Sequence, residues 1–435
     1  MRYHFIGIGG IGISGLAKYM HFRGHEVSGS DIRESVITKK LESEGLHVSI
    51  PQVAKNITNQ EIVVHSAIIR GDNPEILAAK AKGIEVVARR EALLEILHDS
   101  KVYAVAGAHG KSTTSAILSS IMHGSAIIGA ESKEFGSNVR YCEENDILIF
   151  EADESDGSFL NSNPFCAIVT NAEPEHMEYY NYDEELFYNS YREFIQKAPW
   201  RVLNAEDPFL ATLEGDATRL YPSRDIEDIE YILIDDEPHT RFKFKDMGVF
   251  DVWGFGEHIA LDAALAILAA QKSMDIESIR KNILKYKGIK KRFDILISEQ
   301  DISIIDDYGH HPTEIKATLQ SIKEYKRLKN LNSITAIWQP HKYSRTIDNL
   351  EAFVSCFEGV DELIILPVWA ASETEQFIDF EKEFSRYNLS LIHRLNRVGD
   401  TIELIKDDKV IKTLDKGLIV GFGAGDITYQ IRGIK

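Results

Sequence analysis

Short apolar runs alternate with longer amphipathic stretches along the chain, a pattern that predicts parallel strands joined by crossover helices. The pattern divides into three successive groups of elements, here called cycles. The first cycle has strand candidates at Tyr3–Ile8, Glu26–Ser28, Ile62–His65 and Ile84–Val87, with a helix that ends near Arg23. The second has strand candidates at Lys101–Ala106, Ile147–Phe150 and Ala167–Val169, with a helix over Ser112–Met122. The third has strand candidates at Ile302–Ile305, Ile334–Trp338, Glu362–Leu366 and Leu418–Val420, with helices that begin near Pro312 and Asp348.

The three cycles predict three α/β domains. Between Tyr221 and Val252 the pattern turns polar, and an apolar helix follows at about His258–Gln271. We therefore expect domains over residues 1–100, 101–290 and 291–435. The length of 435 residues agrees with this division, because single hydrophobic cores stop growing near ~250 residues.

The composition narrows the functional classes. A formal net charge of −19 disfavours nonspecific binding to nucleic acid or anionic membranes, so any anionic ligand must be held by local groups. No apolar run approaches the ~20 residues that span a bilayer. The cysteines Cys142, Cys166 and Cys356 are scattered and too few to stabilise a chain of this length by disulfide bonds. We expect a cytoplasmic protein, either a monomer or a homodimer.

A first glycine-rich loop follows the first predicted strand. Gly7, Gly9 and Gly12 form a G-x-G-x-x-G pattern that opens a helix, and Asp31 follows the next strand about twenty residues later. Glycines let the backbone approach a diphosphate at a helix N-terminus, where unpaired N–H groups favour negative charge. The same pattern also fits an NAD-binding domain, or a turn that serves only tight packing.

A second glycine-rich loop follows the strand Lys101–Ala106 and leads into a helix. Its residues are Gly107, Ala108, His109, Gly110, Lys111, Ser112 and Thr113. Successive backbone N–H groups can wrap a triphosphate, Lys111 supplies a positive charge, and the Ser112 hydroxyl can bind Mg²⁺. Val105 occupies the position of the first glycine in the usual phosphate-loop pattern, and a chance occurrence is the alternative.

Carboxylates follow the strand Ile147–Phe150, and another acidic stretch follows Ala167–Val169. Glu151 opens the first stretch, and the second ends at His176. Open α/β sheets place ligands at the carboxyl ends of their strands, and oxygen ligands suit Mg²⁺. Each stretch alone would be interpreted as a solvated loop, but their shared position beside the second glycine loop favours a metal site. Two phosphate-binding loops in one chain indicate two phosphate-bearing ligands.

Two polar segments of the third domain also follow strands. His310 and His311 precede Pro312, so one imidazole could cap the next helix as readily as contact a substrate. The segment Gln339–Arg345 carries basic side chains at the carboxyl end of a strand, where they would suit the carboxylate of an amino acid.

The ordered motifs resemble the Mur ligases over nearly the whole chain. They are GIGGIGISGLA, SGSD, AGAHGKSTT, EADESDGSFL, TNAEPEHMEYY, GEH, KRFD, DDYGHHPTEI, WQPHKYSRT and GFGAGDI. The resemblance implies an α/β fold with a Rossmann-like N-terminal domain, a P-loop-type ATPase central domain and a Rossmann-like C-terminal domain. It also implies a ligase of peptidoglycan precursor synthesis, which uses ATP and Mg²⁺ to join L-alanine to the lactyl carboxylate of UDP-N-acetylmuramate through an acyl phosphate.

The resemblance assigns roles to individual residues. It places Gly9, Gly12 and Asp31 nearest the UDP moiety, and ATP at residues 107–113 with Lys111 neutralising charge. The implied metal ligands are Ser112, Glu151 and His176, with Glu154 as the alternative carboxylate. Arg292 and Asp307 match residues that meet the phosphates and ribose of ATP. The residues that would face L-alanine are Tyr308, His310, His341, Lys342 and Arg345, among which His310 is a candidate proton acceptor.

Several positions depart from the family pattern. The loop reads GAHGKST where GTHGKTT is commoner, and Lys342 stands where an arginine is usual. Ile259 and Asp262 replace asparagines, and Pro51-Gln52 replaces Gly-His. Three other functions remain open: an NAD(P)-dependent oxidoreductase, a nonenzymatic nucleotide-binding regulator, and the related ligase that attaches a preformed peptide to the same sugar.

Overall fold

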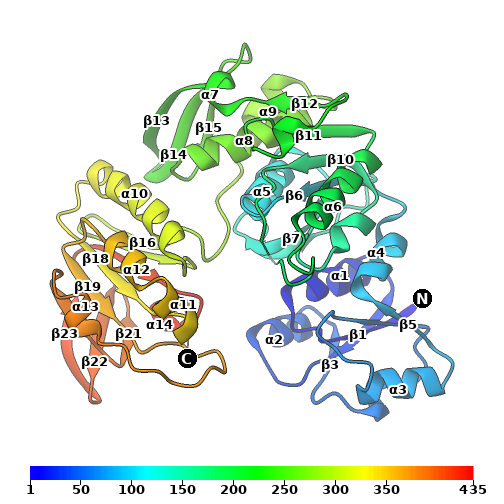
Figure 1. The fold of residues 1–435 in the computed structure, drawn as a ribbon, viewed down its shortest axis with the longest axis horizontal. Helices are drawn as coiled ribbons and strands as arrows, with labels where there is room; N and C mark the ends of the chain where they lie inside the picture. Colours follow the sequence, from blue (N-terminus) through cyan, green and yellow to red (C-terminus); the bar gives the residue numbers. More distant parts are fainter. Residues whose placement is uncertain (176, 435) are drawn as a thin grey trace. The chain divides into compact units, whose positions relative to one another are not determined.

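A computed structural model describes residues 1–175 and 177–434, which form two compact α/β units (Figure 1). Unit 1 comprises residues 1–230, 241–252 and 257–287, and unit 2 comprises residues 231–240, 253–256 and 288–435. Within the described residues, no helix has both the length and the apolar character required to span a membrane.

Unit 1 begins with a parallel sheet in the strand order β3-β2-β1-β4-β5. Its strands are β1 (Arg2–Ile6), β2 (Glu26–Ser30), β3 (His47–Ser49), β4 (Ile62–His65) and β5 (Glu85–Ala88). The accompanying helices are α1 (Ile11–Phe22), α2 (Val36–Ser43), α3 (Pro74–Ala81) and α4 (Arg89–Leu97). Phe5 and Ile6 are fully buried, so β1 forms the centre of this sheet. The first glycine loop therefore leaves the carboxyl end of a central strand.

The second sheet of unit 1 has the order β12-β11-β10-β6-β9-β7-β8. Its strands are β6 (Lys101–Ala106), β7 (Ser125–Ser132), β8 (Ser137–Arg140), β9 (Ile147–Glu151), β10 (Pro164–Val169), β11 (Trp200–Asn204) and β12 (Thr218–Leu220). The longer helices are α5 (Lys111–Ile121), α6 (Glu184–Lys197), α8 (Glu257–Ala270) and α9 (Ile276–Ile283). β6 lies between β9 and β10 and is parallel to both, so the loops after these three strands share one edge.

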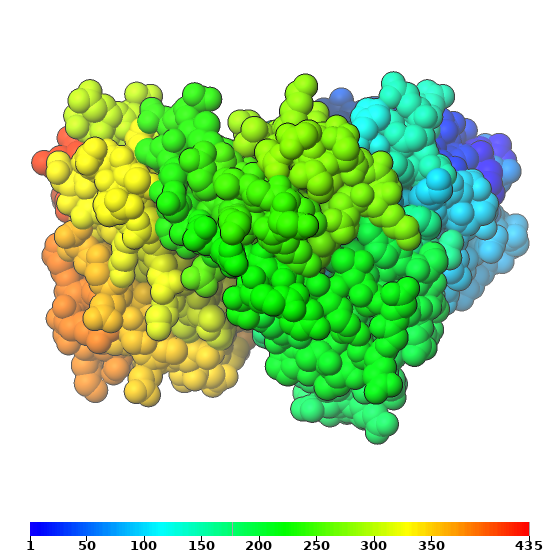
Figure 2. All heavy atoms as spheres, turned by 90° about the horizontal axis from the view of Figure 1, so that it is seen from above, coloured from blue at the N-terminus to red at the C-terminus, as the bar shows by residue number. Residues whose placement is uncertain are grey.

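Helix α1 of the first sheet packs against β7 and β8 of the second. A Cβ on Gly15 would lie 3.1 Å from the Ile127 side chain and 3.2 Å from that of Asn138, so the close approach requires glycine. Lys18 Nζ donates to Ser137 Oγ at 3.2 Å. One cluster of buried side chains runs through both sheets, and Figure 2 shows blue and cyan residues in direct contact at the surface.

Unit 2 contains a sheet in the order β16-β17-β24-β18-β19-β20, in which the β16–β17 pair is antiparallel. The strands are β16 (Asp294–Ser298), β17 (Ile302–Asp307), β18 (Ile334–Trp338), β19 (Glu362–Ile365), β20 (Leu389–Leu391) and β24 (Gly417–Phe422). The helices are α10 (Pro312–Leu328), α11 (Tyr343–Asp348), α12 (Leu350–Cys356), α13 (Phe380–Glu383) and α14 (Ile427–Ile431). β24 lies between β17 and β18, so three loops again share one edge.

Two smaller sheets complete the fold. The strands β13 (Ile226–Ile234), β14 (Glu237–Phe244) and β15 (Val249–Trp253) form one three-stranded sheet. The strands β21 (Arg394–Val398), β22 (Thr401–Lys406) and β23 (Lys409–Leu414) form another, which is antiparallel. The sequence pattern did not predict this last sheet, because its strands have no continuous apolar run and β23 is exposed at five of its six residues.

The prediction of an α/β fold with parallel sheets is confirmed, and most element positions agree with the structure. Ile334–Trp338 has the predicted bounds. The first strand ends at Ile6 rather than Ile8, because Gly7 adopts a φ of +80° that starts the loop. The predicted helix that begins near Asp348 corresponds to α12, which begins two residues later at Leu350, whereas α11 was not predicted. The short element missed at 343–348 lacks the length that gives a clear helical period.

A buried carboxylate connects the segments around the first sheet. Glu75 Oε2 accepts from Ser30 Oγ at 2.5 Å and lies 3.4 Å from His4 Nε2. Glu75 Oε1 accepts from Asn56 Nδ2 at 2.6 Å and from the Val53 N–H at 3.3 Å. Burial alone would raise the pKa of Glu75, but hydrogen bonds from His4, Ser30 and Asn56 outweigh it and lower the pKa.

We predict that Glu75→Gln destabilises the protein by about 1–3 kcal/mol at neutral pH, because a hydrogen-bonded charge is lost from a buried network. A carboxylate with a lowered folded-state pKa stabilises above its unfolded pKa, and the benefit disappears as the pH falls through the folded value. The difference in urea-unfolding midpoint between wild type and variant should therefore shrink below about pH 4. Glu85→Gln, at an exposed position, serves as the control. A difference that does not depend on pH would contradict this role.

Candidate active site

The second glycine loop connects β6 to α5 and packs against the end of β10. Gly107 has a φ of +138° and Gly110 a φ of +83°, conformations that favour glycine. A Cβ on Gly107 would lie 3.0 Å from Asn171 O and would collide with Thr170 Oγ1. The backbone of the loop therefore lies directly on residues 170–171 at the carboxyl edge of the sheet.

Side chains after β10 fix the conformation of this loop. Thr170 Oγ1 donates to His109 O at 2.5 Å. The Asn171 side chain accepts from the His109 N–H at 3.1 Å and donates to His109 O at 3.0 Å. Sequence reasoning missed Thr170 and Asn171, although both immediately follow a predicted strand, which is the signal that identified their acidic neighbours.

Lys111 is held inside the loop. Its Nζ donates to Gly107 O at 2.5 Å and Ala108 O at 3.3 Å, and it lies 3.0 Å from Glu154 Oε1. The Glu154 side chain is 1% exposed, and its Oε2 has no hydrogen-bond partner. Burial raises the pKa of Glu154, although the charge of Lys111 opposes this effect. A cation is thus held against two carbonyl oxygens of the loop, with one buried carboxylate beside it.

Ser112, in the first turn of α5, and Glu151, at the end of β9, form a second polar pair. Ser112 Oγ donates to Glu151 Oε1 at 2.9 Å, and the Gly129 N–H donates to Oε2 at 2.6 Å. Burial raises the pKa of Glu151, while the Gly129 N–H and Lys111 act to lower it. A hydroxyl and a carboxylate at 2.9 Å are a donor set that suits Mg²⁺. His176, the third predicted ligand, lies outside the described residues.

The other residues predicted for this loop keep their expected positions. His109 is exposed and lies 3.5 Å from Glu173 and 3.6 Å from Glu175. Thr113 is partly buried in the first turn of α5. Asp262, on α8, faces the loop, because a Cβ on Gly110 would lie 3.3 Å from its carboxylate carbon.

The first glycine loop is organised by Asp31 and by an arginine that sequence reasoning missed. The Gly9 N–H donates to Asp31 Oδ2 at 2.9 Å. A Cβ on Gly12 would lie 3.3 Å from Arg89 Cζ, so the guanidinium group covers the start of α1. Arg89 also lies 3.4 Å from Asp156, in the acidic stretch after β9. One side chain therefore links the first loop to the loop that carries Glu154.

Asp307 ends β17 and shapes the predicted ATP-contacting segment of unit 2. Its Oδ2 accepts from the Phe293 N–H at 2.8 Å and its Oδ1 from the Gly309 N–H at 2.9 Å. Burial raises the pKa of Asp307, while these two hydrogen bonds act to lower it. Arg292 is exposed next to Phe293. Asp307 thus holds residues 292–293 and 308–309 against the end of one strand.

His310, His341 and Arg345 lie together at the carboxyl edge of the sheet in unit 2. The imidazole rings of His310 and His341 lie 5.9 Å apart, and Arg345 Nη1 lies 3.1 Å from His341 Nδ1. Burial lowers the pKa of His310, although Glu314 opposes this. Burial, followed by the charge of Arg345, lowers the pKa of His341. Both rings are therefore held mainly in the neutral form near pH 7.

Tyr308 and Lys342 flank this group. The rings of Tyr308 and His310 lie 5.4 Å apart. Lys342 has a φ of +70°, and its N–H donates to Trp369 O at 2.8 Å. Four of the five residues predicted to face L-alanine are thus connected through His310, while Lys342 adjoins His341 in the chain. His311 caps α10 by accepting from the Thr313 N–H at 3.4 Å, which confirms the capping role for one of the two adjacent histidines.

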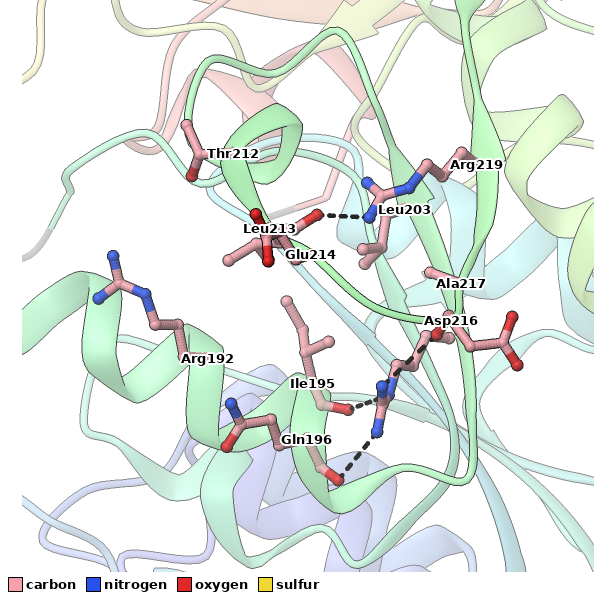
Figure 3. A pocket seen from close by; sticks show the side chains of 11 residues that line it. Arg192, Ile195, Gln196, Leu203, Thr212, Leu213, Glu214, Asp216, Ala217 and Arg219 are labelled. Carbon is pink, nitrogen blue, oxygen red and sulfur yellow. Dashed lines mark hydrogen bonds between the residues drawn. The ribbon is translucent and has the colours of Figure 1, made fainter.

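A separate pocket of unit 1, shown in Figure 3, does not contain these groups. Its arginines hold the surrounding backbone: Arg201 donates to Ile195 O at 3.0 Å and Ala198 O at 3.1 Å, and Arg219 donates to Leu213 O at 2.5 Å. Because these guanidinium groups already have carbonyl partners, we assign the pocket no part in the chemistry.

Comparisons with known proteins identify relatives over the whole chain. A family model described as "Mur ligase family, catalytic domain" matches residues 2–101, and one described as "Mur ligase, glutamate ligase domain" matches residues 291–418. A UDP-N-acetylmuramate–L-alanine ligase from Campylobacter curvus is 53% identical over 432 residues, covering 99% of each chain. One from Helicobacter pylori is 54% identical over 435 residues, covering 99% of this chain and 96% of that one.

Solved structures show a similar fold. The UDP-N-acetylmuramate-alanine ligase of Thermotoga maritima aligns with a TM-score of 0.81 at 24% identity, covering 99% of this chain and 97% of that one. A murein peptide ligase of Psychrobacter arcticus aligns with a TM-score of 0.64 at 20% identity, covering 100% and 99%. At these identities the likeness establishes the shared fold, which agrees with the predicted α/β architecture of three domains.

We predict that Gly107→Ala weakens ATP binding by at least about tenfold, since a displaced loop loses amide contacts to phosphate worth about 1–2 kcal/mol. Gly136→Ala is the matched control, because Gly136 also has a positive φ, +63°, but an added Cβ would meet nothing within 4 Å. In both variants, backbone strain should lower the free energy of unfolding by about 1–2 kcal/mol. Equal ATP affinities in the two variants, measured by calorimetric titration, would contradict the packing described here.

Proposed function

Because the chain belongs to the Mur ligase family, we propose that it joins L-alanine to the lactyl carboxylate of UDP-N-acetylmuramate at the expense of ATP. The relatives that are more than half identical over nearly the full length carry this activity in their names. The observation that carries the proposal is the phosphate loop, in which Lys111 and Ser112 each contact a carboxylate. A dehydrogenase would need only one nucleotide-binding loop, so the loop at residues 107–113 would have no function in it.

Residues 107–113 would bind the triphosphate of ATP, and Ser112 and Glu151 would hold Mg²⁺. The 2.9 Å contact between these two side chains favours Glu151 over Glu154 as the metal ligand, since Glu154 pairs with Lys111. Bound Mg²⁺ would neutralise charge on the phosphate oxygens. His176 remains a proposed third ligand.

Gly9, Gly12 and Asp31 would lie nearest the UDP moiety, where α1 begins. Arg89 adds a cation at this loop, because its guanidinium group lies beside Gly12 at the start of α1. In unit 2, Arg292 and Asp307 would meet the phosphates and ribose of ATP. The residues that would recognise L-alanine are Tyr308, His341, Lys342 and Arg345.

The reaction would proceed in two steps. The γ-phosphoryl group passes from ATP to a lactyl carboxylate oxygen, with Lys111 neutralising charge on the transferring oxygens, and ADP is the leaving group. The amine of L-alanine then attacks the acyl carbon, the new C–N bond forms, and the C–O bond to phosphate breaks. The protein contributes mainly by positioning and by excluding water from the acyl phosphate.

His310 is the proposed acceptor of the proton that the amine releases. Its Nδ1 lies 3.1 Å from Tyr308 O, and a carbonyl oxygen can only accept, so Nδ1 carries the proton. The lone pair of the neutral ring is therefore on Nε2. The lowered pKa of His310 keeps this lone pair available near pH 7.

We propose domains over residues 1–100, 101–290 and 291–435, in a monomer or homodimer of the cytoplasm. Three scattered cysteines are too few to crosslink a chain of this length, which suits a reducing compartment. The net charge of −19 argues against nucleic acid as a partner.

The product assay that tests this function omits one substrate at a time. We expect phosphate release and a UDP-N-acetylmuramoyl-alanine product when ATP, UDP-N-acetylmuramate and L-alanine are all present, and in no mixture lacking one of them. Serine and glycine in place of alanine test amino acid preference. Reduction of a nicotinamide cofactor would favour the oxidoreductase. ATP binding without turnover would favour a regulator. Ligation of a preformed peptide, but not of a single amino acid, would favour the related ligase that attaches such a peptide.

His310→Ala tests the proton acceptor. We expect turnover to fall by about 100-fold or more, because general-base catalysis contributes about 10²–10⁴-fold, while single-turnover ADP formation persists. In the wild type, the rate should decline on the acidic side once the pH falls below the lowered pKa of His310, which protonates Nε2. His311→Ala, which removes the neighbouring cap, serves as the control. Unchanged turnover in His310→Ala would remove this residue from the mechanism.

A further inference from the structure

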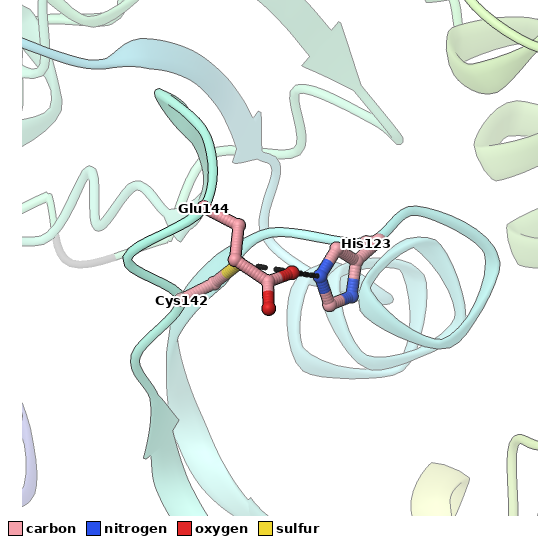
Figure 4. A group of neighbouring side chains, drawn as sticks. All are labelled: His123, Cys142 and Glu144. Atoms are coloured by element: carbon pink, nitrogen blue, oxygen red, sulfur yellow. Dashed lines mark hydrogen bonds and ion pairs between the residues drawn. The ribbon is translucent and has the colours of Figure 1, made fainter.

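A second group of ligand-type side chains lies at the other end of α5 from the phosphate loop. His123 follows the C-cap of α5, while Cys142 and Glu144 follow β8 (Figure 4). One ligand atom from each residue lies within 4.8 Å of the other two. The group combines a nitrogen, a sulfur and an oxygen ligand, a set unlike the oxygen ligands at Ser112 and Glu151.

The spacing of the three ligand atoms is close to that of a tetrahedral metal site. His123 Nε2 lies 3.4 Å from Cys142 Sγ and 2.7 Å from Glu144 Oε2. Tetrahedral zinc, with Zn–S near 2.3 Å and Zn–N or Zn–O near 2.0–2.2 Å, separates such ligands by about 3.4–3.6 Å. The N–S pair alone already has this separation, and Sγ lies within 4.8 Å of the glutamate ligand atom. The N–O pair must open by about 0.7 Å, which is a small rotation for an exposed glutamate.

Hydrogen bonds hold the backbone of this group in place. The Cys142 N–H donates to Ser125 Oγ at 3.0 Å, and Asn145 Nδ2 donates to His123 O at 3.1 Å. Asn145 Nδ2 also lies 3.6 Å from Cys142 Sγ, where it can support a thiolate. The site thus has outer contacts of the kind that orient metal ligands.

The local electrostatics favour a cation. The carbonyl groups at the C-terminal end of α5 carry partial negative charge next to His123. The segment from Cys142 to Asp146 contains three carboxylates and no basic residue, with Glu143 beside Glu144. A bound divalent ion would replace the hydrogen bond between His123 and Glu144 with two stronger metal bonds.

We propose that His123, Cys142 and Glu144 form a binding site for Zn²⁺ or a similar transition-metal ion, with water as the fourth ligand. Thiolate and imidazole ligands select such ions over Mg²⁺. The site is separate from the proposed ligase chemistry, since it lies beyond the opposite end of an eleven-residue helix.

The direct test uses Co²⁺ as a spectroscopic probe in titrations of the full-length protein. A tetrahedral site with one thiolate should give a sulfur-to-cobalt charge-transfer band that saturates at one ion per chain, and Zn²⁺ should abolish it by displacement. Cys142 is the thiol expected to give this charge-transfer band. Burial raises the pKa of Cys166 and raises that of Cys356 to about 12, which keeps both protonated.

Single variants identify the ligands. Cys142→Ser should eliminate the band, and His123→Ala or Glu144→Gln should weaken Co²⁺ binding by about tenfold or more, because each removes one of three protein ligands. Glu143→Gln removes the same charge as Glu144→Gln but from a neighbouring carboxylate that is not a proposed ligand. This variant should bind Co²⁺ with an affinity within about threefold of wild type. Absence of the band, its persistence in Cys142→Ser, or equal loss of affinity in Glu143→Gln would overturn the proposal, whatever the ligase activity of these variants.

Discussion

The contact between Lys111 and the buried carboxylate of Glu154 is the constraint on which the central site depends. A carboxylate 1% exposed is costly unless a cation lies beside it, so the fold must keep Lys111 Nζ within 3.0 Å. The same contact aims the ammonium group into the phosphate loop, where the Gly107 and Ala108 carbonyls also bind it. Stability and function therefore require the same position of one side chain.

Parallel strands bring the remaining groups to that position. In unit 1, β6 carries the phosphate loop, β9 delivers Glu151 and β10 delivers the residues that brace the loop. In unit 2, β17 and β18 deliver His310 and His341 on either side of β24. Both sheets use the carboxyl ends of three adjacent parallel strands. The proposed chemistry is then divided, with the second glycine loop in the first unit and the proton acceptor in the second.

Features that arise from local patterns could be predicted from the sequence. Continuous apolar runs such as Ile334–Trp338 indicated the strands, and glycines located both loops because the positive φ of Gly7, Gly107 and Gly110 favours glycine. Arg89 escaped prediction, because its contacts with Gly12 and Asp156 join segments far apart in sequence. The strands of residues 394–414 escaped because polar and charged residues interrupt them, so that none has a continuous apolar run.

The rate of alanine ligation in Lys111→Ala, compared with Lys101→Ala, tests the central claim most directly. Lys101 begins β6 and makes an exposed pair with Asp146 at 3.5 Å, so its loss removes a lysine from the same strand–loop–helix segment without touching the loop. The account predicts that kcat/KM falls by at least about 100-fold in Lys111→Ala, as expected when a charge contact to a transition state is removed, and stays near wild type in Lys101→Ala. Equal rates in the two variants would contradict it.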